Sequence, residues 1–188
     1  MAKKEWWDDE VPPEGYYQVE VKRGREFLLR ISNGQDILDV LQRFAVKNKI
    51  MVARVHTAYM GAVKPQVYLK YVPHPDRIDP NSASKYVKEF EIKRWMQEIP
   101  VTEDNLGMVL SLSGLIVPKN PGEPPEVKIH FVSGASWESE LTGGHMEPGT
   151  RVSGEFSVFV TELTGIEMVW ADGKKFSYEH WFKESNSL

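Results

Sequence analysis

The stretch Val109-Leu-Ser-Leu-Ser-Gly-Leu-Ile-Val117 decides the fold. Its bulky apolar and β-branched residues form a short run that is typical of a buried strand. Similar runs lie on both sides of it along the chain, at residues 16–21, 26–32, 51–72, 127–132 and 151–163. The run at 51–72 is interrupted at Gly61 and Pro65, so we expect two strands with a bend there.

One segment between these runs predicts a helix, at residues 32–49. Ser32 can serve as its N-cap, and Gln35 three residues later completes a capping box. Apolar residues then recur every three or four positions, which makes one stripe on a helix: Ile37, Leu38, Val40, Leu41, Phe44 and Ala45. Residues 85–98 fit either a strand or a helix. We therefore expect an α+β fold, a mostly antiparallel β-sheet flanked by helices.

The chain of 188 residues suits one domain. Residues 1–15 are an acidic N-terminal extension, residues 16–165 form the domain, and residues 166–188 form a C-terminal hairpin and tail. Asp172-Gly173 has the signature of a tight hairpin turn in that last segment.

Composition excludes several classes of protein. The chain has no cysteine, which rules out disulfides, thiolate nucleophiles and Cys-ligated metals. The N-terminus lacks the apolar core of a secretory signal, and no apolar run approaches the roughly 20 residues that span a bilayer. We expect a cytoplasmic protein without a membrane partner. A net charge of −4 argues against DNA binding by the whole surface, although a local patch is compatible with it.

The stretch from Thr142 to Gly149 is the richest in chemistry, and we expect a loop over residues 133–149. Gly143, Gly144 and Gly149 are its loop-shaping residues, since glycine allows sharp turns and close approach of other groups. His145 follows directly, and His130 lies in the preceding strand. A strand and its following loop can bring two imidazoles together, as in many metal sites.

Two histidines are too few for a metal site. A transition metal such as zinc would need a further ligand from His56, Glu126, Glu147 or a second subunit. The serine-nucleophile, P-loop and dinucleotide motifs are all absent. The sequence therefore identifies no catalytic residue and favours a protein without enzymatic activity.

Several of these segments together resemble the PPC domain, the plant-and-prokaryote conserved domain. The resemblance rests on Gly34–Leu38, Gly61–Val63, Leu110–Gly114, His130, and Gly143–Met146 with Gly149, and it spans about residues 27–163. It implies an antiparallel sheet flanked by helices and a homotrimer. It also implies an association with DNA, and some members hold a metal through clustered histidines.

This sequence departs from that pattern at two positions. Lys128 stands where the family often has the first histidine of His-x-His, and Met108 stands in place of a glutamate. Lys128 supplies a fixed cation, for an anionic ligand or for a structural ion pair. The leading hypothesis is a non-enzymatic homotrimeric binding or assembly module associated with DNA or regulatory partners. The alternatives are a metal or small-ligand site at His130, His145 and Lys128, in a binding protein or an enzyme, or a purely structural His145.

Overall fold

The computed structural model describes residues 19–59, 61–73, 96–118, 122–135, 141–168 and 182–184. Its elements are, in chain order, β1 (Lys22–Ile31), α1 (Ile37–Asn48), β2 (Ala53–Tyr59), β3 (Ala62–Val63), β4 (Gln66–Pro73), β5 (Met96–Glu103), β6 (Gly107–Pro118), β7 (Pro125–Ala135), β8 (Leu141–Met146), β9 (Val152–Ser153), β10 (Phe156–Thr164), β11 (Ile166–Met168) and β12 (Phe182–Glu184).

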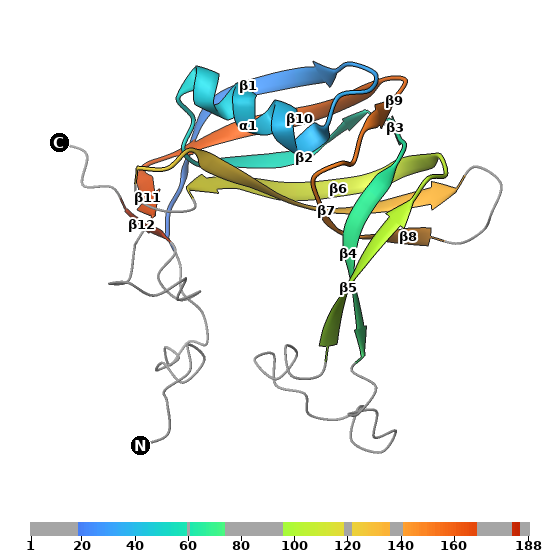
Figure 1. Cartoon of the computed structure of the whole chain (residues 1–188). Coiled ribbons are helices and arrows are strands. Elements are labelled where there is room, and N and C mark those ends of the chain that lie inside the picture. The colour runs from blue at the N-terminus through green and yellow to red at the C-terminus, as the bar shows by residue number, and fades with distance from the viewer. Residues whose placement is uncertain are drawn as a thin grey trace, which may run out of the picture.

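The predicted antiparallel sheet is confirmed. Its strands follow the order β1-β10-β2-β6-β7-β8-β4-β5, with β3 pairing to β6 and β9, and every pairing is antiparallel. The quoted stretch lies inside β6, next to β2 and β7 in the middle of this order. β4 and β5 form a hairpin that projects away from the body (Figure 1).

The expectation of several flanking helices is wrong for the described part of the chain, which contains one helix, α1. Within this same part, no helix is long and apolar enough to cross a membrane.

The N-cap of α1 is Asp36 rather than Ser32. The Asp39 backbone N–H donates to the Asp36 carboxylate at 3.2 Å, while the Ser32 carbonyl accepts from Gln35 in the turn before the helix. The Asp36 carboxylate accepts a hydrogen bond from a backbone N–H in the first turn that has no partner within the helix. The helix therefore begins at Ile37, later than the capping box at Ser32 predicted.

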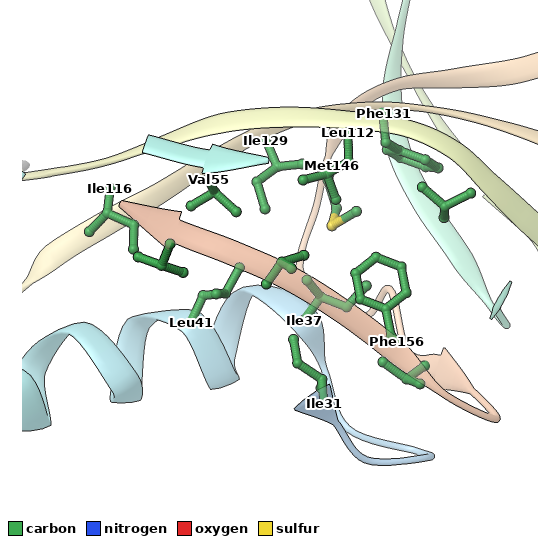
Figure 2. Close-up of a cluster of buried hydrophobic side chains, with 14 of the residues drawn as sticks. Ile31, Ile37, Leu41, Val55, Leu112, Ile116, Ile129, Phe131, Met146 and Phe156 are labelled. Carbon is green, nitrogen blue, oxygen red and sulfur yellow. The ribbon is translucent and has the colours of Figure 1, made fainter. Parts of the chain in front are cut away.

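The apolar stripe of α1 packs on the sheet as expected. Ile37, Leu41 and Ala45 are fully buried, and Leu38, Val40 and Phe44 pack at the margin of the same core. Figure 2 shows Ile37 and Leu41 facing side chains of the sheet such as Val55 and Ile129. Burying each such side chain contributes about 1.5–3 kcal/mol, which orients the helix over this face.

Alternation along β7 separates the two faces of the sheet. Ile129, Phe131 and Ser133 are buried on the face that α1 covers, whereas Lys128, His130 and Val132 point to the opposite face. We call this opposite side, which α1 does not cover, the open face.

The expected loop at residues 133–149 is wrong over most of its length, because β7 continues to Ala135 and β8 occupies Leu141–Met146. The run at 51–72 contains three strands instead of two, and residues 96–98 of the ambiguous segment belong to β5. Three predictions lie outside the described residues: the N-terminal extension at 1–15, the remainder of the ambiguous segment at 85–95, and the hairpin turn at Asp172-Gly173.

Candidate functional site

His130 and His145 meet on the open face. They are directly opposite each other in the β7–β8 pairing, and the Nδ1 atom of His145 lies 3.1 Å from the Nε2 atom of His130. The rings are nearly perpendicular, with centroids 5.0 Å apart and an interplanar angle of 72°. The two rings are joined by a hydrogen bond, in which one of these two nitrogens carries the hydrogen and the other accepts it.

Two adjacent glycines allow β8 to reach this position. A Cβ atom on Gly143 would lie 2.1 Å from the Phe131 carbonyl oxygen, and one on Gly144 would lie 2.1 Å from the Leu69 carbonyl oxygen. Only glycine permits such close approach on both sides of a strand. These residues therefore shape a tight strand and set His145 between β7 and β4.

The turn after β8 is anchored to the helix and to β4. Gly149 has a φ of +104°, a conformation that favours glycine, and its N–H donates to the Asp36 carboxylate at 2.5 Å. The Thr150 hydroxyl donates to the Val67 carbonyl at 2.8 Å and accepts from the Val67 N–H at 2.9 Å. The turn that follows His145 is thus held to both the start of α1 and β4.

The remaining candidate ligands lie at different distances from the histidine pair. Glu147 approaches His145 most closely, with Oε1 3.9 Å from Nε2. Glu126 is engaged by Lys128, whose Nζ lies 2.8 Å from its Oε1. His56 is in the same cross-strand row as His130, but Ser113 lies between them.

His56 occupies a separate environment. Its ring stacks on Phe159 with centroids 5.3 Å apart, and within the described part of the chain its buried Nε2 atom has no hydrogen-bond partner. The sequence could not separate it from the pair, because its distance from His130 along the row depends on the strand order β2-β6-β7.

Electrostatics favour the neutral form of His130. Partial burial of the ring lowers the pKa of His130 below its ordinary 6.5, and a positive charge on the nearby His145 lowers it further. A neutral imidazole keeps a lone pair available to accept a hydrogen bond or to bind a metal.

The pair supplies part of a metal site. Two nitrogens on one tetrahedral zinc ion lie about 3.3–3.4 Å apart, given Zn–N bonds of about 2.0–2.1 Å, which is close to the 3.1 Å found here. Among the described residues, however, no group of three or more His, Asp and Glu side chains is placed to hold a metal ion. These residues alone do not fit a resident zinc ion, since ligands from elsewhere would be required.

The pair borders a hollow of about 660 Å³ on the open face, which we call the imidazole groove. Sequence reasoning missed several residues that line it, namely Arg54, Leu69, Tyr71, Glu98, Ser113 and Leu115. Gly114 lies in its floor, where a Cβ atom would collide with the Lys128 carbonyl oxygen at 2.2 Å. Alternation in β2 could have indicated Arg54, because buried Ala53 and Val55 flank it.

In its described part the chain is thus an antiparallel β protein with one helix and with a histidine pair across β7 and β8. The profile of the Plants and Prokaryotes Conserved (PCC) domain matches residues 18–164. The chain belongs to this family, as the resemblance in its sequence implied.

Solved structures share this fold at low sequence identity. A metal-containing protein from Archaeoglobus fulgidus is 23% identical, with a TM-score of 0.59, over 90% of this chain and 99% of that one. A plant- and prokaryote-conserved protein from Pyrococcus horikoshii is 22% identical, with a TM-score of 0.59, over 92% and 100%. A candidate DNA-binding protein from Bacteroides thetaiotaomicron is 14% identical, with a TM-score of 0.54, over 88% and 99%. No curated protein matches the chain.

Proposed function

We propose that this protein is a non-enzymatic PCC-domain module that assembles as a homotrimer through the open face of its sheet and associates with DNA or regulatory partners. The observation that carries the assembly is an exposed apolar surface on that face. Contiguous apolar surface on a folded protein commonly marks a contact with another protein.

Three neighbouring strands contribute to this surface. Leu110 of β6, Val132 of β7 and Leu141 of β8 are 48%, 40% and 67% exposed, and we call them the apolar patch. Gly134 lies between two of them, since a Cβ atom built on it would be 3.5 Å from Leu110 and 3.7 Å from Leu141. Burying these side chains against copies of themselves would remove apolar area from water, which is the main driving force of association.

Light scattering on the full chain tests the assembly. The wild-type protein should have three times the 21.6 kDa mass of one chain, and Leu141→Glu should shift it to the monomer mass. Val46→Glu is the matched control, because Val46 is equally apolar and exposed but lies on α1. A monomeric wild type, or equal dissociation by both variants, would reject this mode of assembly.

The proposal of DNA as a partner draws on the Bacteroides thetaiotaomicron protein, which has the same fold and is named for DNA binding. A trimer would present three copies of any weak contact, and avidity would multiply them. Binding to duplex DNA should weaken steeply between about 50 and 200 mM salt, because phosphate contacts release counterions. If the protein does not bind DNA at the lower salt concentration, DNA is not its partner, and only the regulatory partners of this proposal remain.

The second candidate is a ligand site at His130 and His145, for a metal or a small molecule. The 3.1 Å contact between their ring nitrogens favours it, because neither ring is turned into the core. Elemental analysis of untagged protein measures any bound metal, and His145→Ala should remove it while leaving the oligomer mass unchanged. Undiminished metal in that variant would place the metal elsewhere on the protein.

A further inference from the structure

The imidazole groove combines a concave shape with several hydrogen-bond donors that point into one space. Ligand sites typically pair apolar walls with a few converging polar groups. Leu69, Tyr71 and Leu115 form the apolar part of this groove, while Arg54, Lys128 and the histidine pair supply donors. Its volume of about 660 Å³ suits a small organic molecule.

Arg54 is the most informative of these donors. Several other arginines hold carboxylates: Arg25 pairs with Glu162 at 2.7 Å and Arg43 with Asp39 at 2.9 Å. The exposed Arg54 side chain, by contrast, makes no hydrogen bond or ion pair within the part of the chain that the structure describes. A guanidinium without a partner at the wall of a groove presents its planar set of donors to an incoming oxyanion.

Strand register places a second cation near Arg54. Arg54 is opposite Leu115 in the β2–β6 pairing, and Leu115 is opposite Lys128 in the β6–β7 pairing. The two cations therefore flank Leu115 in one cross-strand row, with main chains roughly 10 Å apart at two strand spacings. Lys128 holds Glu126 at 2.8 Å and adds its positive charge to this row.

The next row supplies further donors. Ser113 is opposite His130, and His130 is opposite His145, so a hydroxyl and two imidazoles follow one another across β6, β7 and β8. Together with the cations they surround the same groove. An oxyanion bound between Arg54 and Lys128 would have further N–H and O–H groups from this row within the site.

Carboxylates also line the groove, and their positions define its polarity. Glu147 lies beside His145, and Glu98 is on β5, opposite Tyr71, beyond β8 and β4 from the two cations. The two cations thus lie on β2 and β7, whereas the carboxylates lie on β5 and directly after β8. A ligand carrying one negative group would be oriented by this difference.

We propose that the imidazole groove binds a small organic oxyanion, with its carboxylate or phosphate between Arg54 and Lys128 and its apolar body against Leu69 and Leu115. This inference rests on the second candidate function and names its ligand class. It follows from the donor set: the described residues provide no third metal ligand, whereas an unpaired guanidinium and an ammonium group line the same space.

Calorimetric titration of the full chain in about 0.15 M salt tests this proposal. The probes are phenyl phosphate and benzoate, which share an apolar ring and differ in their oxyanion. At least one should bind at one site per chain, and Arg54→Gln should raise its dissociation constant about tenfold or more, the effect of losing a charged hydrogen bond. The probe that binds more tightly identifies phosphate or carboxylate as the preferred group.

Arg151→Gln is the matched control. Arg151 is also exposed and its side chain likewise makes no ion pair among the described residues, but it does not line the groove. Its variant should bind the probes as the wild type does. Equal weakening in both variants would show attraction by net charge and overturn the site, as would failure of both probes to bind.

The result also separates this inference from the functions on which it rests. If neither probe binds but metal is retained and lost in His145→Ala, the ligand site remains and the oxyanion is wrong. If neither probe nor metal binds while the mass is that of a trimer, the assembly function stands without a ligand. Unchanged thermal unfolding of Arg54→Gln would confirm that any loss of binding does not come from misfolding.

Discussion

Gly143 and Gly144 show how single residues build this site. Each lies where main-chain carbonyl oxygens of neighbouring strands approach within 2.1 Å of a would-be Cβ atom. Because β8 is wedged between β7 and β4, the absence of two side chains is what places His145 opposite His130. The histidine contact therefore depends on residues that carry no functional group of their own.

Replacing Gly144 with alanine should destabilise the protein by about 1–3 kcal/mol, because the added methyl group forces β8 away from the Leu69 carbonyl. The urea midpoint of unfolding measures this loss. Gly134→Ala is the control on the adjacent strand, where the new Cβ atom meets only side chains at 3.5 Å or more, and it should change stability by less than about 0.5 kcal/mol. Equal effects would mean that the close approach at Gly144 is not maintained in solution.

The His130 imidazole should titrate below the ordinary range of a histidine. Partial burial and the neighbouring His145 both lower the pKa of His130, so its ring should lose its proton below the ordinary value of 6.5. NMR titration of the ring protons measures this directly. In His145→Gln the pKa of His130 should rise only in part, because burial is the larger cause and persists. A His130 pKa above 6.5 in the wild type would contradict the arrangement.

At the scale of elements, one carboxylate connects the helix to the site. Asp36 caps α1 through the Asp39 N–H at 3.2 Å and also accepts the Gly149 N–H at 2.5 Å. The Ile37 N–H donates to the Thr150 carbonyl at 3.1 Å, so the start of α1 and the turn after β8 hold each other. The position of His145 is consequently coupled to the helix, although the two lie on opposite faces of the sheet.

Asp36→Ala should cost about 1–2 kcal/mol, because it removes the cap and leaves the Gly149 N–H without its partner. Chemical denaturation quantifies this cost. Asp39→Ala is the control in the first turn of the same helix; it loses an exposed pair with Arg43 and should cost less than about 1 kcal/mol. If both changes were equally costly, the link between α1 and the turn would be unimportant.

At the scale of the whole molecule, charge makes the fold sensitive to acid in two stages. The folded-state pKa of His130 is lowered, so the unfolded chain binds more protons and stability falls as the pH drops through 6.5. The Arg25 side chain lowers the pKa of Glu162 below its ordinary 4.5, so the stability from this pair is lost at still lower pH, as Glu162 becomes protonated.

Unfolding by urea at a series of pH values should therefore show stability declining below about pH 6.5 and again below about pH 4.5. His130→Gln should flatten the first decline, and Glu162→Gln should flatten the second. A wild-type protein that is more stable at pH 5 than at pH 7.5 would contradict the sign of the His130 effect.

The sequence by itself determined the sheet, the apolar face of α1 and the two histidines of interest. Apolar residues recur every two positions on a half-buried strand and every 3.6 positions on a helix. These patterns lie within one segment, so they can be recognised without knowing which other segment packs against it. The same local reading failed at Gly143 and Gly144, where a loop was expected and a strand is found. Glycine signals loops on average, and only the neighbouring strands reveal that it is required for close packing here.

Only the tertiary structure decided which residues share the open face with the histidines. Arg54 comes from β2, a strand distant from β7 in the chain, and it joins Ser113 and His130 through the order β2-β6-β7. That order also separates His56 from the pair and leaves Leu110, Val132 and Leu141 together on the surface. Strand order arises from the packing of the whole core, so no local pattern along the chain specifies which side chains meet.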